Sequence, residues 1–587
     1  MQLNGLLVEN FKSYENMTCI PVSDLSILMG ANSSGKSTAL QTLLVLKQTV
    51  ECNSLDIDLL LSGKYVTLGD YEDVVNNSQK KYFSLGVSVI GDRFTENYDN
   101  NNVTDIAWKF ISSKERDITL KEIDFRIAND KIKLIRSKDY IYDIIINEKN
   151  TALSVKINNL LCNRLYVNYH SDFNMLFYEF LSEILKCFCV DKKQSTLERK
   201  KFVALDTVEK FYWELMRRNR SKSSDQNDDE YRQKIWELTN RVIKDIEKYC
   251  EHQFEYYINF ETIPQNLKEN ILFHCLYKNE KNEQLKVVLE KYEHILDEEN
   301  RKKVDNVNDR FDEVAIERIY NLGSQEKGIN SESDIISDAF RVYQEVINRI
   351  LCKIFYLGPI REKPQGLYNV GFEAIPKYVG TSGAYFASVL LRENKEKEYI
   401  LPNGRLEKMS LLEAADEWAA RLNVASKIQV EKKNSFGFSV SISNTQRRKS
   451  DIMNVGIGTS QVLPVLITGL LSEEGEYLLF EQPELHLHPY SQSRLADFFV
   501  ELVKRGRKII VETHSEYFIL RLRYQILKNN INKNNVVINF FQNKGGTKIS
   551  QGEISGYGNI QYPEDFRDET QKLLDDLMNA ALEKRGQ

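Results

Sequence analysis

The sequence has no apolar run long enough to span a lipid bilayer. One of its longest apolar stretches, residues 462–471, falls far short of the roughly 20 residues that a membrane helix needs. The first residues, MQLNGLLVENFKSYENM, also lack the positively charged segment followed by an apolar stretch that marks a secretion signal. The sequence therefore predicts a soluble, cytoplasmic protein that has no membrane partner.

Cysteine, proline and an excess of charge of one sign are also scarce. Only 8 cysteines and 10 prolines occur among 587 residues, and the cysteines lack the paired spacing of a zinc site. We interpret the cysteines as free buried thiols. Lys and Arg number 79 against 85 Asp and Glu, a formal charge of −6, so a contact with nucleic acid would require a local basic patch.

The pattern of apolar residues divides the chain into four segments. Residues 1–165 pass from a glycine-rich loop to stretches of period two, which predicts the first half of an α/β domain and an antiparallel β-lobe. Residues 166–350 are charged with apolar residues at helical spacing, which predicts a helical insertion. Strands alternate with helices in residues 351–545, which predicts a parallel sheet that completes the first domain. Residues 546–587 predict a hairpin and a C-terminal helix cap.

The strongest motif is a phosphate-binding loop, GANSSGKS, between an apolar strand and a helix. Its glycines permit several backbone N–H groups to converge on one anion, and the helix adds its positive N-terminal end. Lys36 would reach the β- and γ-phosphates, and Ser37 would hold Mg²⁺. The predicted nucleotide-binding residues of this loop are Gly30, Asn32, Ser33, Ser34, Gly35, Lys36 and Ser37.

A second motif is a short apolar strand, residues 477–480, that ends in acidic residues. In a P-loop ATPase this strand normally ends in an Asp that reaches Mg²⁺ through water, and a Glu that orients the attacking water follows. Here the two positions hold Glu481 and Gln482. Glu481 could serve the metal, so the predicted metal-binding residues are Ser37 and Glu481. Gln482 could position a water but cannot accept its proton, and Glu484 is the nearest spare carboxylate.

Two further segments follow the order that a P-loop ATPase would require. His514 follows an apolar strand, where its imidazole could hydrogen-bond the γ-phosphate and report its presence. The loop NVGIGTSQ precedes an apolar helix, so its glycines and serine could form a second anion site. The predicted residues of this second site are Gly456, Gly458, Ser460 and Gln461. The predicted catalytic residues are Glu481, Gln482, Glu484 and His514.

This order of motifs resembles the ATP-binding-cassette heads of the SMC, RecF and OLD ATPases. More closely, SSGKSTALQTLLVLKQ, YLGPIRE, NVGIGTSQVLP, EQPELHLHP and YGNIQYPEDFRDE are similar to a bacterial ATPase family of antiphage defence, the Septu and retron-associated ATPases. The resemblance implies an ABC-type α/β head with a mixed or parallel sheet, an antiparallel β-lobe and a large helical insertion. It also implies ATP and Mg²⁺ as cofactors, and control of a separate effector, a nuclease.

The resemblance implies a head-to-head dimer, or a higher oligomer, with two ATP molecules at the interface. Each ATP would rest on Lys36, Ser37 and Thr38 of one subunit and face the 456–461 loop of the other. These heads usually carry Glu at the position of Gln482, so the resemblance implies slow hydrolysis in which ATP acts as a clamp. It further makes His514 the switch histidine and places residues 483–489 at the dimer contact.

The residues leave several alternatives open. One is a self-contained OLD-like nuclease, although only 73 residues follow His514 and such a domain needs roughly 100 with an acidic cluster. Another is an SMC-like DNA clamp without a defence role, although no long heptad pattern is present. Contact with DNA or a phage component would rest on small basic clusters such as 217–222 and 447–449. His486 and His488 could also bind a metal with Glu484.

Overall fold

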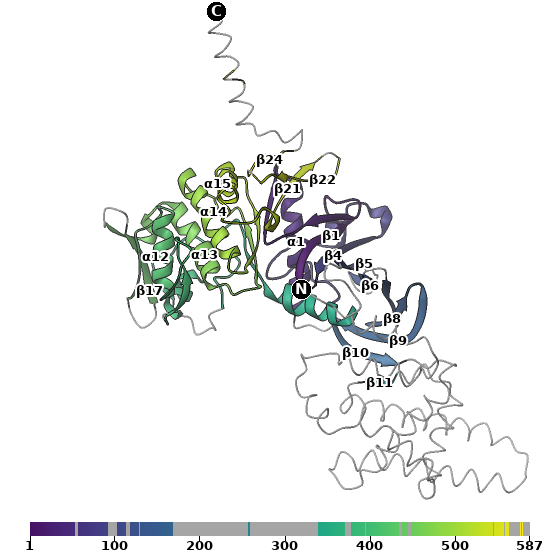
Figure 1. The fold of residues 1–587 in the computed structure, drawn as a ribbon. Coiled ribbons are helices and arrows are strands. Elements are labelled where there is room, and N and C mark those ends of the chain that lie inside the picture. The colour runs from purple at the N-terminus through teal and green to yellow at the C-terminus, as the bar shows by residue number, and fades with distance from the viewer. Residues whose placement is uncertain are drawn as a thin grey trace, which may run out of the picture. The chain divides into compact units, whose positions relative to one another are not determined.

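Figure 1 shows the fold as a computed structural model. It describes residues 1–52, 57–91, 103–112, 118–127, 130–167, 256–258, 339–369, 377–393, 395–433, 437–443, 448–543, 545–556, 558–562, 576 and 578. The chain divides into two compact units, of which the first contains residues 1–124 and 345–587 and the second contains residues 125–344.

The first unit is built on a six-stranded sheet that joins distant parts of the chain. Its order is β12 (Ile354–Leu357), β19 (Tyr477–Glu481), β20 (Lys508–Glu512), β3 (Leu25–Gly30), β21 (Val536–Asn543) and β22 (Thr547–Gln551). All neighbours are parallel except β22, which runs antiparallel to β21. The residues of β3 are buried throughout, as is typical of a parallel strand that is covered on both faces. The parallel sheet predicted for the α/β domain is therefore confirmed.

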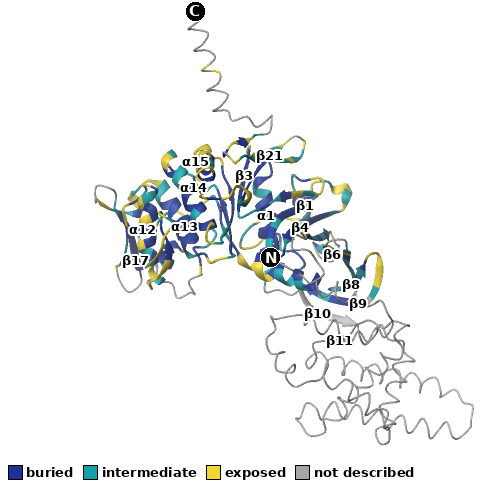
Figure 2. Cartoon of the chain, in the orientation of Figure 1, coloured by how far each residue is buried: buried dark blue, intermediate teal, exposed yellow. Residues whose placement is uncertain are grey.

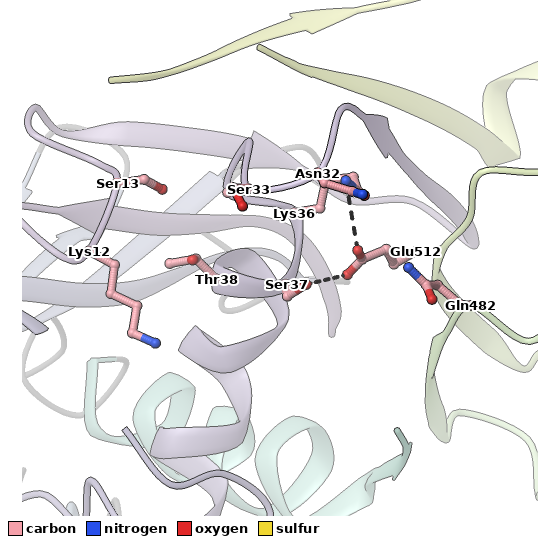
Figure 3. A pocket seen from close by; sticks show the side chains of 10 residues that line it. Lys12, Ser13, Asn32, Ser33, Lys36, Ser37, Thr38, Gln482 and Glu512 are labelled. Carbon is pink, nitrogen blue, oxygen red and sulfur yellow. Dashed lines mark hydrogen bonds and ion pairs between the residues drawn. The ribbon is translucent and has the colours of Figure 1, made fainter. Parts of the chain in front are cut away.

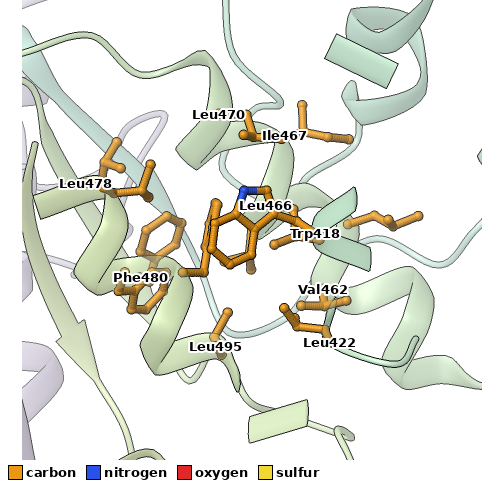
Figure 4. Packing of buried hydrophobic residues seen from close by; sticks show 14 of the residues in the cluster. Trp418, Leu422, Val462, Leu466, Ile467, Leu470, Leu478, Phe480 and Leu495 are labelled. Atoms are coloured by element: carbon orange, nitrogen blue, oxygen red, sulfur yellow. The ribbon is translucent and has the colours of Figure 1, made fainter. Parts of the chain in front are cut away.

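Helices of the first unit follow its strands. Helix α1 (Lys36–Val50) follows β3, and α13 (Ile457–Leu471), α14 (Pro489–Val503) and α15 (Glu516–Leu527) lie side by side (Figure 1). Helices α13, α14 and α15, together with α12 (Leu411–Arg421), bury a large apolar core (Figure 2). Figure 4 shows Trp418 of α12 packed among residues of α13 and β19, and its ring lies 4.7 Å from that of Phe498. This packing fixes β19, which carries the acidic motif.

Antiparallel strands account for most of the remaining β-structure. In the first unit, β2 (Thr18–Pro21), β1 (Gln2–Glu9), β4 (Tyr82–Ile90) and β5 (Val103–Ile111) pair in that order. Strand β6 (Thr119–Ile127) contains the boundary between the units. In the second unit, β7 (Asp130–Lys138), β8 (Ile141–Ile146), β9 (Lys149–Asn158) and β10 (Leu161–Val167) are antiparallel, and β11 (Tyr256–Ile258) is parallel to β10. The predicted antiparallel β-lobe is confirmed.

Shorter elements complete the described part of the first unit. They are α2 (Tyr71–Val74), α11 (Phe386–Arg392), β13 (Tyr368–Asn369), β14 (Lys397–Ile400), β15 (Leu406–Met409), β16 (Lys427–Lys432), β17 (Gly437–Ser443), β18 (Lys449–Asp451), β23 (Glu553–Ile554) and β24 (Ile560–Gln561). Among the helices of the described ranges, none is long and apolar enough to cross a membrane.

Several predictions fall largely outside the described residues. Of the predicted helical insertion, only 166–167, 256–258 and 339–350 are described, and of the C-terminal helix only two residues are described. The three boundaries between the four predicted segments stay predictions. The expectation of buried thiols is wrong for Cys19 and Cys352, which are free but exposed. Cys19 lies on the solvent side of strand β2, next to the buried Ile20.

Candidate functional site

The phosphate-binding loop is shaped by backbone geometry that only its sequence allows. Gly30 ends β3 and Gly35 precedes α1, and both have positive φ angles, 154° and 99°. A Cβ at Gly35 would lie 2.5 Å from Thr547 Oγ1, and a Cβ at Gly30 would collide with the carbonyl of Phe541. Glycine is therefore required at both positions for conformation and for space.

Neighbouring segments hold this loop in place. The hydroxyl of Tyr14 donates to the Gly35 carbonyl at 2.9 Å, and that of Thr547 donates to the Ser34 carbonyl at 3.0 Å. The Lys36 ammonium folds back over the loop and donates to the carbonyls of Gly30 and Ala31, at 3.0 and 2.7 Å. Burial lowers the pKa of Lys36, and the negative charge of Glu512 opposes this effect.

Glu512, the last residue of β20, contacts two predicted nucleotide-binding residues. Ser37 Oγ donates to Glu512 Oε2 at 2.8 Å, and Lys36 Nζ lies 3.8 Å from Glu512 Oε1 (Figure 3). Burial raises the pKa of Glu512, while Ser37 and Lys36 oppose that shift. Glu512 is not among the residues predicted from the sequence motifs. The available signal was its position at the end of an apolar strand, two residues before His514.

These residues surround a cavity of about 350 Å³ at the end of the parallel sheet (Figure 3). Its lining residues are Lys12, Ser13, Asn32, Ser33, Gly35, Lys36, Ser37, Thr38, Gln482 and Glu512. The cavity is within the size range of small-molecule sites. It brings most of the predicted loop residues together with Gln482 of the acidic motif. Its hydroxyl and carboxylate oxygens are of the type that Mg²⁺ prefers, so these residues fit a Mg²⁺–nucleotide complex.

Glu481 does not line this cavity. Its carboxylate accepts a hydrogen bond from the Tyr356 hydroxyl at 2.8 Å, and burial raises its pKa to about 7. The buried Arg361 donates to the carbonyls of Glu481 and Gln482, at 3.1 and 3.4 Å. Gln482 has a φ of 44°, a left-handed conformation that is uncommon for residues other than glycine. Its N–H donates to the Glu512 carbonyl at 2.8 Å, which links the ends of β19 and β20.

Glu484 and His514 meet beside the cavity. The backbone N–H of His514 donates to Glu484 Oε1 at 2.8 Å, and the Glu484 side chain is buried. The His514 side chain is exposed and does not line the cavity. Partial desolvation lowers the pKa of His514, and the positive charge of Lys36 lowers it further. The imidazole is therefore neutral at pH 7 and could both donate and accept a hydrogen bond.

The second predicted anion site lies away from the cavity. Gly456 precedes α13, and Gly458 packs so closely against the backbone of His486 that a Cβ would collide with its carbonyl. Ser460 and Gln461 are buried within α13. None of these predicted residues lines the cavity in the described chain.

The described residues do not form the alternative metal site. His488 precedes α14, and its Nδ1 accepts the Tyr490 backbone N–H at 3.3 Å, so the side chain acts as a helix cap. No group of three His, Cys, Asp or Glu residues in the described ranges is placed to hold a metal ion.

A family model described as an AAA ATPase domain matches residues 1–519. The chain belongs to the AAA ATPase domain family. This ATPase is also similar to the Smc head domain of Pyrococcus furiosus, solved with an extended coiled coil and the C-terminal domain of ScpA. That likeness has 12% identity, 98% coverage of this chain, 99% coverage of the other and a TM-score of 0.32. The SMC head domain from Thermotoga maritima is also similar, with 9% identity, 94% coverage of this chain, 100% coverage of the other and a TM-score of 0.29. A search of curated protein sequences found no match.

The residues that line the cavity agree with membership of this ATPase family. The ATPase carries a complete phosphate loop, and the loop residues that bind phosphate in P-loop ATPases face one cavity with Gln482 and Glu512. The protein is therefore an ATP-binding ATPase of the P-loop class.

Proposed function

We propose that this ATPase binds Mg²⁺–ATP, hydrolyses it slowly, and uses the bound nucleotide to hold two subunits together. The observation that carries the proposal is the cavity, where Lys36 and Ser37 face Gln482. Lys36 would bind the β- and γ-phosphates, and Ser37 with an acidic strand-end residue would hold Mg²⁺, which neutralises phosphate charge when bound. The amide of Gln482 would orient a water molecule but could not accept its proton.

Dimerisation would complete the site from a second subunit. The 456–461 loop does not line the cavity, and in the proposed dimer it would face the nucleotide of the other subunit. Two large apolar side chains, Met453 just before the loop and Ile457 within it, are 56% and 62% exposed. Their exposure supports a contact surface at this place, because apolar side chains gain free energy when they leave water. His514 would report the γ-phosphate.

The output of the ATP cycle is proposed to be control of a separate effector, a nuclease, in antiphage defence. This step rests on the sequence resemblance alone. DNA contact through residues 447–449 receives little support, because Lys449 pairs with Glu431. The other basic cluster, 217–222, lies outside the described residues. Phage plating on cells that carry the wild type or Lys36→Ala tests the defence role, and equal plating would contradict it.

The test of the biochemical function is ATP binding and turnover by the purified chain. We expect the wild type to bind ATP and turn it over slowly. Lys36→Ala should weaken binding at least about 100-fold, because a charge-assisted contact to phosphate is lost. Gln482→Glu should speed turnover about 100-fold, the lower end of the usual contribution of a general base.

Controls separate these effects from folding. Gln551→Glu makes the same chemical change at an exposed position and should alter neither property. Light scattering should show an ATP-dependent dimer for the wild type and none for Lys36→Ala. Rapid wild-type turnover that Gln482→Glu does not increase would contradict the clamp, and absence of ATP binding would contradict the whole proposal.

A further inference from the structure

Two buried glutamates end neighbouring strands of the ATP site. Glu481 of β19 and Glu512 of β20 are register partners, and the two residues are 8% and 4% exposed. A P-loop ATPase needs a carboxylate near the phosphate-loop hydroxyl to help hold Mg²⁺. The geometry around each glutamate decides which of them can do this.

Only Glu512 reaches the phosphate loop. Its Oε2 accepts the Ser37 hydroxyl at 2.8 Å, its Oε1 lies 3.8 Å from Lys36 Nζ, and it lines the cavity (Figure 3). Strand pairing explains this position, because β20 lies directly beside β3, and Glu512 is the partner of Leu28. Leu28 lies two residues before Gly30, where β3 ends and the phosphate loop begins, so the Glu512 carboxylate lies beside this loop.

Glu481 is one strand further from the phosphate loop and has other partners. Its carboxylate accepts the Tyr356 hydroxyl at 2.8 Å, and Arg361 holds its backbone carbonyl at 3.1 Å. Strand β20 lies between β19 and β3 in the sheet. Glu481 does not line the cavity. Its contacts fix the end of β19 and the strained turn at Gln482.

We propose that Glu512, together with Ser37, is the protein's Mg²⁺-binding pair, and that Glu481 is a positioning residue that supports the end of β19. Mg²⁺ is usually bound by one or two protein oxygens together with phosphate oxygens and waters, and this pair supplies a carboxylate and a hydroxyl. Glu512 lies against both Lys36 and Ser37, the groups that would meet phosphate and cation. This assignment rests on the proposed ATP binding and deepens it.

The test compares ATP affinity in excess Mg²⁺ with ATP affinity in EDTA, by titration of a fluorescent ATP analogue. The wild type should bind more tightly with Mg²⁺. Glu512→Gln should reduce this Mg²⁺-dependent gain about 10- to 100-fold, the usual effect on metal affinity of losing a supporting group. Its affinity in EDTA should be equal or higher, because a negative charge beside the phosphates is gone. Glu481→Gln should keep the gain within about twofold.

A second readout avoids turnover altogether. Mn²⁺ replaces Mg²⁺, and electron paramagnetic resonance measures the Mn²⁺ bound in the ATP complex; Glu512→Gln should lose it and Glu481→Gln should retain it. Glu417→Gln, at an exposed position of α12, is the matched control. Glu512→Asp keeps the charge and serves if Glu512→Gln does not fold; it should retain part of the gain.

The outcomes are distinguishable from failure of the proposed function. If the wild type does not bind ATP, the proposed function and this assignment both fail. If it binds ATP equally with Mg²⁺ and EDTA, the assignment fails and ATP binding stands. If Glu481→Gln rather than Glu512→Gln loses the gain, only the assignment fails.

Discussion

The ends of β19 and β20 differ more in their surroundings than in their sequence. Both are apolar strands that finish in a buried glutamate, and the two glutamates face each other in register. At β20 the carboxylate contacts Lys36 and Ser37, which belong to the phosphate loop. At β19 it contacts Tyr356, which is followed closely in the chain by the buried Arg361. The partner of a strand-end carboxylate, and not its place on the strand, therefore determines what it can do.

In the proposed assignment, the end of β20 binds Mg²⁺ and the end of β19 supports the site. Arg361 is the centre of the supporting end, because it holds the carbonyls of both Glu481 and Gln482. Burial lowers its pKa to about 10, and the nearby Glu484 opposes that shift, so Arg361 stays charged at neutral pH. Removal of a buried cation leaves the neighbouring buried acids without a counter-charge, which lowers the free energy of unfolding.

The largest effect on stability is expected for Arg361→Ala. It leaves the carbonyls at 481 and 482 without donors and the acids without a counter-charge, so the free energy of unfolding should fall by about 3 kcal/mol. Urea denaturation measures this loss. Arg505→Ala, which removes an exposed arginine, should cost about 0.5 kcal/mol or less. An equal loss in both variants would show that Arg361 does not support β19.

An intermediate effect is expected for Glu481→Gln, and it depends on pH. The folded-state pKa of Glu481 is about 7, above its ordinary value of 4.5, so the folded chain binds a proton that the unfolded chain has lost. Stability from this group is therefore complete below about pH 4.5 and is lost as pH rises to about 7. Gln cannot ionise, so the variant should be more stable than the wild type by roughly 1–3 kcal/mol at pH 8 and similar at pH 4.5.

Denaturation of both proteins across this pH range measures the difference. Asp416, whose pKa burial raises to about 6, contributes in the same direction and cancels when the two curves are subtracted. A difference that is independent of pH would show that Glu481 is not neutralised by burial in the folded chain.

The sequence alone predicted what depends on local chain geometry. The phosphate loop is a continuous segment whose glycines, lysine and helix start all lie within eight residues, and the structure places most of the residues predicted there around one cavity. The parallel sheet and the β-lobe were readable from the spacing of apolar residues. The role of each of these residues in catalysis stays a prediction.

What the sequence could not predict depends on which strands become neighbours. Glu512 lies 475 positions from Ser37, and their contact exists only because β20 pairs with β3. Arg361 lies in the YLGPIRE segment, which resembles a known family. The resemblance does not indicate that Arg361 donates hydrogen bonds to the end of β19. No spacing rule connects positions so far apart, so the choice between Glu481 and Glu512 required the sheet order.

The smallest effect is expected for Tyr356→Phe, and it tests the supporting end most directly. The Tyr356 hydroxyl is a hydrogen-bond donor to the Glu481 carboxylate and lowers its pKa, against the larger effect of burial. Loss of this donor should cost about 1 kcal/mol and raise the folded-state pKa of Glu481 further, which extends the upper end of the pH window in which stability is lost. Tyr399→Phe removes a buried hydroxyl that has no hydrogen-bond partner among the described residues, and it should leave the window unchanged. Because Glu512 has its own partners, neither variant should alter the Mg²⁺-dependent gain in ATP affinity; a loss of that gain in Tyr356→Phe would show that the two strand ends act as one site.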